Sequence, residues 1–478
     1  MKRRDAFKLA TLSIAGLAGT AGKSSAQPGP GMMHGMGPMR QPPTDGAHQG
    51  GPKPLAIRYL ETVKAKLEMI RRTQSDTMLE TAHAMARTVA RGNTVWTYWD
   101  TGHSASFDIF DTRPAVPQFF GIGYDITKTK KGDMVLATTV EPVDWEDAAK
   151  KNVFVVGRPV PWGGDSEGPQ TIVESLRQRR VKPHANIWID TKETKSGPMI
   201  ELPGAPVPFG PVSGIIGLTM FWMMTSDACR ILAQDGKKAA VSGDEPELKS
   251  DRADWISTET PIMGDCFTQF MNRYELIASE MGAIREAAGM AVDSALGGGT
   301  AWCYSRFQGG LPSEGHGRRG GLFLTKGLTI ENGSLQPREG RPLTAKDTVF
   351  MDIREPDHPT DLTVLDAVRK IGMKVVSFGP TTRGFAIPEG RTVPKEADVH
   401  IGRMSDTWGI YAVPGFPRRI CPTSGATVMQ SFWMTCMEIA DQIIRRTGNV
   451  PAFYMSGAIE GSQQYNGAMQ TKFNTRGY

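Results

Sequence analysis

Cysteine is scarce in this chain, which has five cysteines among its 478 residues. Their spacings fit neither the paired ligands of a zinc site nor the framework of a disulfide-rich domain. Two of them, Cys229 and Cys436, fall in apolar helical stretches, where we expect the thiols to pack as small hydrophobic groups. The odd count leaves at least one free thiol. The remaining three are Cys266, Cys303 and Cys421.

Net charge and long hydrophobic runs are also lacking. The formal charge is +5, and residues 1–26 hold five basic residues and one acidic residue, so removing them takes away +4 and leaves about +1. A near-neutral chain lacks the electrostatic footprint of a nucleic-acid-binding protein. After residue 26 no apolar run is long enough to predict a stable membrane span. We therefore expect neither nucleic acid nor membrane as a partner.

The first 26 residues have the pattern of an export signal. Arg3 and Arg4 precede a short apolar run over 9–18, and Ala26 closes a small-residue cleavage site. Paired arginines before a weakly hydrophobic segment are typical of the twin-arginine (Tat) route, although an ordinary secretory signal fits the same residues. The sequence thus predicts a periplasmic or otherwise extracytoplasmic protein.

Residues 27–54 are rich in Gly, Pro, Met and His and have almost no β-branched or aromatic residues. Such a composition cannot offset the entropy of ordering, so we expect a disordered linker. Thioether and imidazole groups suit soft copper, but the ligand spacing does not repeat. A spacer is the preferred interpretation, and no metal or cofactor is assigned.

One phrase occurs twice in the chain. Pro211-Val212-Ser213-Gly214, followed by Phe221-Trp222-Met223, recurs as Pro422-Thr423-Ser424-Gly425 and Phe432-Trp433-Met434, displaced by 211 positions throughout. A single turn of this kind is a weak signal, but its recurrence with the same aromatic triplet at the same spacing predicts a tandem repeat. The function must then be that of a pair of repeated domains.

A second match gives the size of the repeated unit. Trp96 and Tyr98 recur as Trp302 and Tyr304, displaced by 206. A period near 210 corresponds to two copies of a whole domain. With 39 % hydrophobic residues the chain can bury two cores. We place a first half at residues 55–245 and a second half at residues 246–478, and expect the repeated tryptophans to belong to these cores.

Short apolar runs indicate the fold class. The first half has such runs at 94–98, 134–137, 153–156 and 187–189, and the second half at 300–304, 348–351, 374–378 and 399–401. Continuous apolar strands spaced by helix-length intervals are typical of parallel sheets covered on both faces. The predicted fold is α/β, with two doubly wound three-layer αβα sandwiches packed as a pseudo-twofold pair. Long helices are expected at 55–91 and after each repeated turn.

These residues resemble the sugar isomerase (SIS) fold. The likeness rests on the Gly102-His103-Ser104 loop after the first strand, on Pro422-Thr423-Ser424, and on the stretch from Pro451 to Asn466. The chain is similar to the little-characterised SIS group with a G-H-S loop, and the resemblance covers residues 55–478. It implies binding of a sugar or sugar derivative, with isomerisation, cleavage or sensing as the function. It also implies an intramolecular pseudo-dimer, with further homo-oligomerisation open.

In an open parallel sheet, ligands lie beyond the carboxyl ends of the strands, and hydroxyls or free backbone N–H groups there bind anions. Arg318 and Arg319 form a pair on a glycine-rich loop that could bind phosphate or carboxylate. The first half lacks this Arg pair, so the two sites cannot be equivalent. The two serines of the repeated phrase are either ligand-binding groups or helix N-caps. The candidate ligand-binding residues are Thr101, Gly102, Ser104, Ser106, Ser213, Ser305, Arg306, Ser313, Arg318, Arg319, Thr423, Ser424 and Asn466.

Isomerisation needs a base near C1 and C2 of the sugar and an acid for ring opening. Glu314 and His316 are the first candidates, with Glu355 or His103 as partner. The chain departs from the family, however, where a Ser-rich phosphate loop is expected. Residues 138–141 and 352–355 contain carboxylates there, which repel phosphate, and residues 463–465 read Gln-Gln-Tyr in place of acidic and His residues.

Two functions therefore remain open, and the sequence does not decide whether the protein is an enzyme. The first is an exported aldose–ketose isomerase with its site between the halves. The second is a non-catalytic module that binds a carbohydrate derivative and has lost the catalytic and phosphate loops. A third interpretation, a structural surface protein whose Met/His segment holds metal, predicts no response to sugars.

Overall fold

The computed structural model describes the chain from residue 53 onward, with gaps. The described residues are 53–97, 108–109, 113–122, 127–137, 148, 150–157, 186–190, 198–248, 254–307, 310–331, 334–337, 341–384, 386–402, 404–455 and 461–478. Lys53–Tyr478 forms one compact unit. The predicted signal peptide and nearly all of the predicted linker lie outside the described residues.

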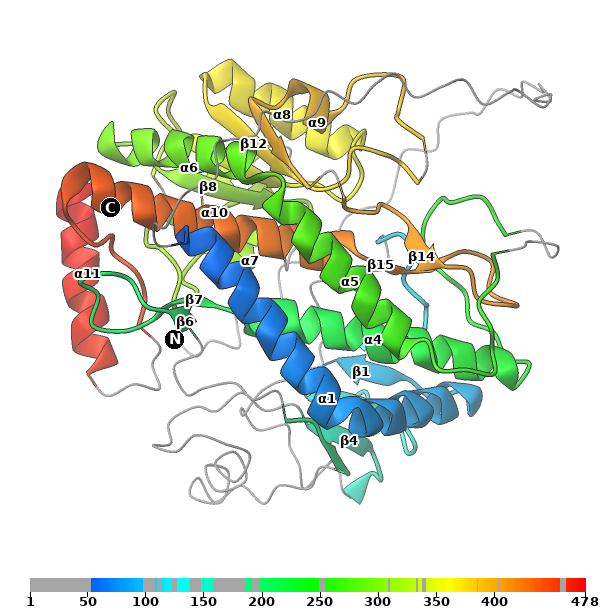
Figure 1. Cartoon of the computed structure of the whole chain (residues 1–478). Coiled ribbons are helices and arrows are strands. Elements are labelled where there is room, and N and C mark those ends of the chain that lie inside the picture. Colours follow the sequence, from blue (N-terminus) through cyan, green and yellow to red (C-terminus); the bar gives the residue numbers. More distant parts are fainter. Residues whose placement is uncertain are drawn as a thin grey trace. The chain divides into compact units, whose positions relative to one another are not determined.

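Long helices form the centre of this unit (Figure 1). Helix α1 (Leu55–Ala90) begins after Pro54, and Gly92 follows it with φ +76°, a left-handed conformation that glycine adopts without strain. Its buried positions recur every three or four residues, as the apolar periodicity predicted. In the second half the corresponding stretch is divided into α5 (Met263–Ala278) and α6 (Met281–Leu296).

The first half contains a parallel five-stranded sheet in the order β2-β1-β3-β4-β5. The four apolar runs predicted as strands correspond to β1, β3, β4 and β5, and only β2 was missed. Strand β2 was not predicted because it has three residues, one of them a glycine, and so shows no strand periodicity in the sequence. The strands are β1 (Val95–Thr97), β2 (Phe120–Ile122), β3 (Met134–Ala137), β4 (Phe154–Gly157) and β5 (Ile187–Trp188).

The second half contains a six-stranded sheet in the order β10-β9-β8-β11-β12-β13, in which only β10 is antiparallel. Without β10, the order repeats that of the first sheet. Strands β9 and β10 were not predicted, because polar residues interrupt their apolar pattern. The strands are β8 (Ala301–Ser305), β9 (Thr325–Glu331), β10 (Ser334–Pro337), β11 (Thr348–Asp352), β12 (Lys374–Phe378) and β13 (Val399–Ile401).

Each sheet is followed by a short antiparallel strand pair and a long buried helix. In the first half these are β6 (Pro198–Ile200), β7 (Phe209–Pro211) and α4 (Ser213–Gln234). In the second they are β14 (Gly409–Tyr411), β15 (Ile420–Pro422) and α10 (Ser424–Thr447). The repeated phrase thus occupies the same place in both halves, at the end of a strand and the start of a helix.

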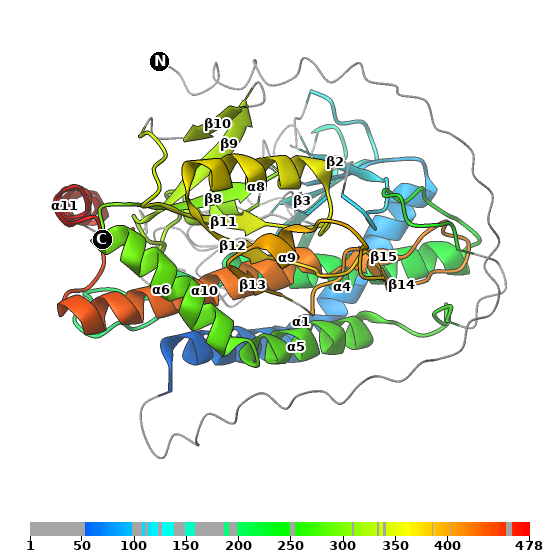
Figure 2. The same cartoon turned by 90° about the horizontal axis from the view of Figure 1, so that it is seen from above.

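The second sheet is the middle layer of an αβα sandwich. Trp302 and Tyr304 pack on the side of α8 (Pro359–Ile371), whereas Ala301 and Cys303 belong to the large central core. This alternation follows from the two-residue period of a strand. Figure 2 shows α8 on one side of the sheet and α6 and α10 on the other. The predicted α/β class with mainly parallel sheets is confirmed.

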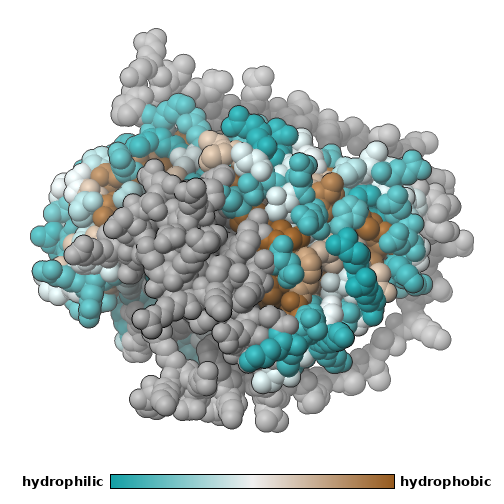
Figure 3. Space-filling view, turned by 90° about the horizontal axis from the view of Figure 1, so that it is seen from below, coloured by the Kyte–Doolittle hydropathy of each residue, from teal (hydrophilic) through white to brown (hydrophobic). Residues whose placement is uncertain are grey.

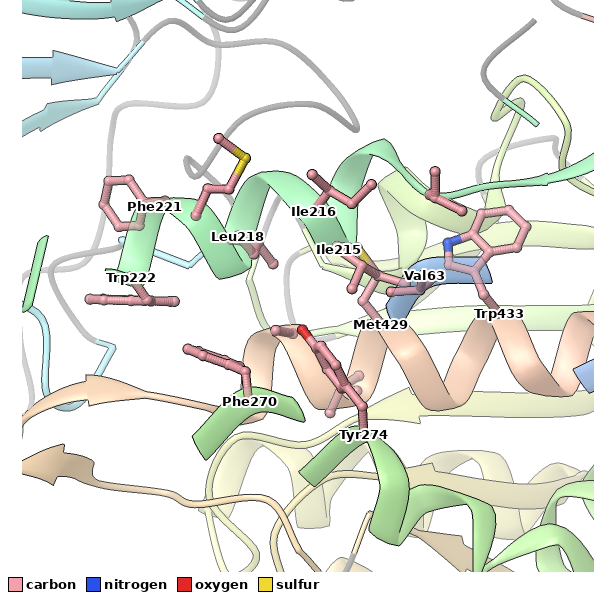
Figure 4. Close-up of a cluster of buried hydrophobic side chains, with 14 of the residues drawn as sticks. Val63, Ile215, Ile216, Leu218, Phe221, Trp222, Phe270, Tyr274, Met429 and Trp433 are labelled. Atoms are coloured by element: carbon pink, nitrogen blue, oxygen red, sulfur yellow. The ribbon is translucent and has the colours of Figure 1, made fainter. Parts of the chain in front are cut away.

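The five central helices make the contacts of a pseudo-twofold pair, in which α5 and α6 together correspond to α1. Helix α1 packs on α4 as α6 packs on α10, and across the halves α1 packs on α10 as α5 packs on α4. Trp222, Phe270 and Tyr274 lie in the apolar space between these helices (Figure 4). Helix α4 is long and apolar enough to span a membrane, but its apolar window is completely buried within the protein. It is a core helix by position.

The described surface is mainly polar. In Figure 3 the described residues of one face are largely hydrophilic, with some hydrophobic residues near the middle. The large apolar side chains that are substantially exposed come from separate elements, and single exposed apolar residues are usual in proteins. They are Leu276, Leu296, Ile387 and Met404. The other helices of the described residues are α7 (Leu311–Gly315), α9 (Val393–Glu396) and α11 (Ser462–Arg476).

Candidate functional site

Glu314, the first predicted catalytic base, lies in α7 (Leu311–Gly315) directly after β8 and is 1 % exposed. Its Oε2 accepts a hydrogen bond of 3.0 Å from Trp433 Nε1, and Arg318 Nε lies 3.5 Å from the same oxygen. Arg318 in turn donates from Nη2 to Ser213 Oγ at 2.8 Å. The carboxylate is therefore part of a buried chain of contacts that ends in the other half.

Asp108 occupies the matching place in the first half. Its Oδ2 accepts a hydrogen bond of 2.9 Å from Trp222 Nε1, and its Oδ1 accepts one of 2.9 Å from Arg113 Nε. Arg113 donates from Nη2 to Ser424 Oγ at 2.8 Å. A Cβ atom on Gly425 would lie 2.4 Å from the Asp108 carboxylate, so the glycine of the repeated phrase permits this approach.

We call these two groups the reciprocal clusters: Asp108, Arg113, Trp222 and Ser424 in one, and Glu314, Arg318, Trp433 and Ser213 in the other. In each, the acid is bonded to the tryptophan of its own half, and the arginine reaches the serine of the opposite half. The recurrence of both Ser and Trp in the sequence is explained by this exchange.

The structure decides two points about these residues. The first half lacks the Arg pair, since Pro114 follows Arg113, but Arg113 alone makes the contact that Arg318 makes. The repeated serines do not act as N-caps, since neither α4 nor α10 has a side-chain cap bond. Each accepts from a buried guanidinium instead. The tryptophans are in the core as expected: Trp222 is 0 % and Trp433 is 1 % exposed.

Burial dominates the electrostatics of the clusters. Burial raises the pKa of Glu314, and Arg318 and the Trp433 hydrogen bond partly oppose this. Burial also lowers the pKa of Arg113, opposed chiefly by Asp108. An ionised group in the interior is tolerated only when it is paired and hydrogen-bonded. Each cluster supplies that pairing, and Glu314 has almost no exposed surface from which to reach a substrate.

A further carboxylate, Asp352, lies at the carboxyl end of β11, where the Ser-rich phosphate loop was expected. Its Oδ2 accepts from Ser305 Oγ at 3.1 Å and from the backbone N–H of Leu311 at 3.4 Å. Arg354 holds the same group with its Nε 2.7 Å from Oδ1. A Cβ atom on Gly310 would come within 2.3 Å of Asp352 Oδ2. The carboxylate thus sits in a small cradle of donors.

Arg354 joins this strand-end carboxylate to the first half. Its Nη1 donates to Asp108 Oδ1 at 3.3 Å, and its side chain is 3 % exposed. Although burial opposes the charged form, Asp352 and Asp108 raise the pKa of Arg354. The halves were predicted to meet at the strand ends. Arg354 and Asp108 make one contact between them, and neither residue was among the ligand candidates.

Glu355, another predicted catalytic residue, belongs to an ion-paired group further out. Arg306 Nη2 donates to its Oε1 at 2.7 Å, and Arg383 Nη2 donates to its Oε2 at 3.3 Å. Arg306 also lies 3.4 Å from Asp361, whose Oδ1 accepts from Tyr304 Oη at 3.0 Å. Burial raises the pKa of Asp361 to about 7.

The remaining candidates are scattered. Thr423 donates to Asp406 Oδ2 at 2.7 Å, and Asn466 holds the backbone of Met455 through two hydrogen bonds, so both have structural partners. Ser313, His316 and Arg319 are partly exposed around α7.

The predicted Thr101, Gly102, His103, Ser104 and Ser106 lie outside the described residues, as does the 138–141 loop. Among the described residues, no three His, Cys, Asp or Glu side chains form a group that could hold a metal.

Three residues of the candidate site were not singled out by sequence reasoning: Asp108, Arg113 and Arg354. Asp352 was noted only as a carboxylate that repels phosphate. The displacement of 206 that relates Trp96 to Trp302 also relates Asp108 to Glu314, so the first could have been found. Arg113 lies one position off the place that this displacement assigns to the counterpart of Arg318. Its contact with Ser424 joins residues 311 positions apart, which local spacing does not reveal.

No protein-family model and no curated protein sequence matches the chain. Among solved structures, it is similar to the C-terminal domain of glucosamine-fructose-6-phosphate aminotransferase from Francisella tularensis, with a TM-score of 0.42, 11 % identity, and coverage of 85 % of this chain and 99 % of that one. It is also similar to tagatose-6-phosphate ketose/aldose isomerase from Escherichia coli, with a TM-score of 0.40, 11 % identity, and coverage of 83 % and 95 %. At these values the similarity by itself assigns neither a family nor an activity.

Proposed function

We propose that the chain is an SIS-type protein that binds a sugar or sugar derivative without isomerising it. The ligand site is proposed at the carboxyl ends of the strands, where the halves meet. The proposal is supported by the motif resemblance at 102–104, 422–424 and 451–466 and by the shared strand order of two mainly parallel sheets. Ligands of open α/β sheets bind at that edge.

The observation that carries the proposal is the place of Asp352. Its carboxylate takes the hydrogen bonds of Ser305 Oγ and Leu311 N and the ion pair of Arg354. These are the kinds of donor that bind an anion. Because the protein's own carboxylate occupies them, a ligand phosphate would be repelled there rather than held. We infer an unphosphorylated ligand.

The absence of isomerisation is inferred from Glu314. A general base must come within hydrogen-bonding reach of the proton that it removes. Glu314 is 1 % exposed and engaged by Trp433 and Arg318. Glu355 is likewise engaged by Arg306 and Arg383. Both carboxylates have structural partners that a substrate would have to displace, which favours a binding function.

The organisation of the chain is proposed as follows. Residues 1–26 form a twin-arginine signal, residues 27–54 form a linker, and residues 55–245 and 246–478 are two copies of one ancestral domain. The protein acts in the periplasm or another extracytoplasmic compartment. Replacing both Arg3 and Arg4 by Lys should retain the protein in the cytoplasm, as cell fractionation would measure. Unchanged export would contradict the assigned route.

The ligand class is tested by thermal shift and isothermal titration with matched pairs of sugars, each pair comprising a free sugar and its 6-phosphate. We expect the unphosphorylated members to raise the melting temperature of the mature protein and the phosphates to have less effect. In Asp352→Gly the preference should move towards the phosphate, because the cradle of donors is vacated. Asp398→Gly, a partly exposed carboxylate of the same half, is the control. Stronger binding of phosphates by the unmodified protein would overturn the proposal.

A further inference from the structure

A cavity of about 220 Å³ opens between α5 and the antiparallel pair β14–β15. Gln269 and Arg273 of α5 line one wall, and Ile410, Tyr411 and Arg419 line the other, with Asp406 between them. No residue of the Asp352 cradle is among the lining residues. Its size is below that of drug-binding pockets, which usually exceed about 300 Å³, so it suits a ligand about as large as a single sugar.

The charged lining groups are two arginines and one carboxylate. Arg419 also pairs with two carboxylates outside the lining, Asp254 and the buried Glu245, whose Oε1 lies 3.8 Å from Arg419 Nε. Arg273 holds Asp406 with its Nε and Nη2, both within 2.9 Å of Oδ2. Arg419 donates from Nη1 to the carbonyl of Ile410 at 3.1 Å and from Nη2 to Asp254. The second arginine is therefore fixed by the backbone of the cavity wall while its outer side meets a carboxylate.

The carboxylate on that outer side is exchangeable. The side chain of Asp254 is 42 % exposed, whereas that of Arg419 is 10 % exposed. An ion pair with an exposed member contributes little net stability, because water screens it. A ligand carboxylate can consequently take the place of Asp254 at Arg419 Nη2, in a charge-assisted hydrogen bond.

The rest of the lining fits a hydroxylated molecule. Asp406 and the side-chain carbonyl of Gln269 are hydrogen-bond acceptors at the cavity, and hydroxyl groups are donors that such acceptors bind. Ile410 and the ring of Tyr411 supply apolar surface, while the Tyr411 hydroxyl is already used on Asp265 at 2.6 Å. Acceptors on one wall and a guanidinium on the other select a ligand with hydroxyls at one end and a carboxylate at the other.

We propose that this cavity is a second binding site, for a small hydroxylated carboxylic acid of the sugar-acid class. It does not depend on the site proposed at the strand ends. A link to the reciprocal clusters exists nevertheless, because Asp406 accepts from Thr423 at the start of α10, and the next residue, Ser424, receives Arg113. A ligand in the cavity would therefore contact Asp406, which is bonded to the helix start that joins the halves.

The test uses D-glucuronate as the probe and D-glucose as its uncharged counterpart, measured by isothermal titration and ligand-detected NMR on the mature protein. We expect glucuronate to bind, and Arg419→Gln to weaken its binding by about tenfold or more, as the loss of a charge-assisted contact predicts. Arg418→Gln is the matched control, since Arg418 lies next in sequence and donates to the backbone carbonyls of 241 and 245. Its effect should be within twofold, an estimate of roughly 0.4 kcal/mol.

A second variant distinguishes loss of the binding contact from misfolding of Arg419→Gln. Ile410→Trp fills the cavity without removing a charge and should abolish glucuronate binding while the far-UV circular dichroism stays unchanged. The proposal is overturned if glucuronate does not bind the unmodified protein, if it binds both arginine variants equally, or if the filled cavity still binds it. Loss of free-sugar binding at the strand ends in Arg419→Gln would also contradict the independence of the two sites.

Discussion

Arg113 donates a hydrogen bond of 2.8 Å to Ser424 Oγ although the two residues are 311 positions apart in the chain. The same contact exists in the opposite sense between Arg318 and Ser213. Both arginines are buried, and a buried guanidinium without acceptors is costly. Separating the halves would remove the serine acceptor from each of these two groups and leave each with the acid of its own half. The reciprocal clusters therefore make the fold of each half depend on the presence of the other.

Removing one of the repeated serine hydroxyls should destabilise the protein. Ser424→Ala leaves Arg113 Nη2 without its acceptor in the interior, and we expect a loss of about 1–3 kcal/mol in the free energy of unfolding. Ser213→Ala should have a similar effect through Arg318. Ser431→Ala is the control, because Ser431 Oγ is buried in the same helix α10 and has no hydrogen-bond partner. Denaturant unfolding measures all three, and equal losses for Ser424 and Ser431 would refute the assigned role.

The tryptophans of the repeated phrase should stabilise the charged form of their acids. Trp433→Phe removes the donor to Glu314, which is expected to cost about 1.5–3 kcal/mol at neutral pH for a bond to a charged group. The pKa of Glu314, already raised by burial, should rise further, since the Trp433 bond lowers it. Trp302→Phe is the matched control: its indole N–H is buried without a partner, so it reports lost packing alone. If both variants lose the same stability, the hydrogen bond has no separate effect.

The stability of the protein should depend on pH through Asp361. Its pKa is about 7 in the folded protein against an ordinary value of 3.8, so the folded state binds this proton more tightly than the unfolded chain does. The contribution is fully present below the unfolded pKa and is lost as pH rises through the folded pKa, at a rate of about 1.4 kcal/mol per pH unit in between. Thermal unfolding from pH 4 to pH 8 measures the slope.

Asp361→Asn should remove this slope, because an amide cannot titrate but can still accept the bond from Tyr304. Asp366→Asn is the control, since Asp366 lies in the same helix α8 at the surface and is paired with Arg391. A stability profile that keeps its slope in Asp361→Asn would assign the pH dependence to another group.

Much of the fold followed from local patterns in the sequence. The short continuous apolar runs at 134–137, 348–351 and 374–378 identified inner parallel strands, since a strand buried on both faces needs continuous apolar residues. Strands β14 and β15 were missed because they are short and carry no alternation. The break between α5 and α6 was also missed, because a helical period continues across residues 279–280 with only a local change of direction.

The site was less predictable, because its contacts join distant positions. Glu314, Arg318, Ser213 and Ser424 were predicted as catalytic or ligand-binding residues, and that prediction stands untested. Their partners within the protein were not foreseen. Whether a carboxylate faces solvent or a tryptophan depends on tertiary packing that no local spacing encodes. Asp352 illustrates this: its sequence position predicted repulsion of phosphate, whereas the structure adds Ser305 and Arg354 as its own internal partners.

The most direct test of the account is hydrogen exchange at C2 of a sugar that the protein binds, followed by NMR in deuterated water. Aldose–ketose isomerisation removes this proton, so an isomerase exchanges it even when little product accumulates. We predict saturable binding with no exchange above that of the buffer. Exchange catalysed by the unmodified protein and lost in Glu314→Gln would contradict the account, because it would assign a catalytic function to a carboxylate described here as a buried structural partner of Trp433 and Arg318.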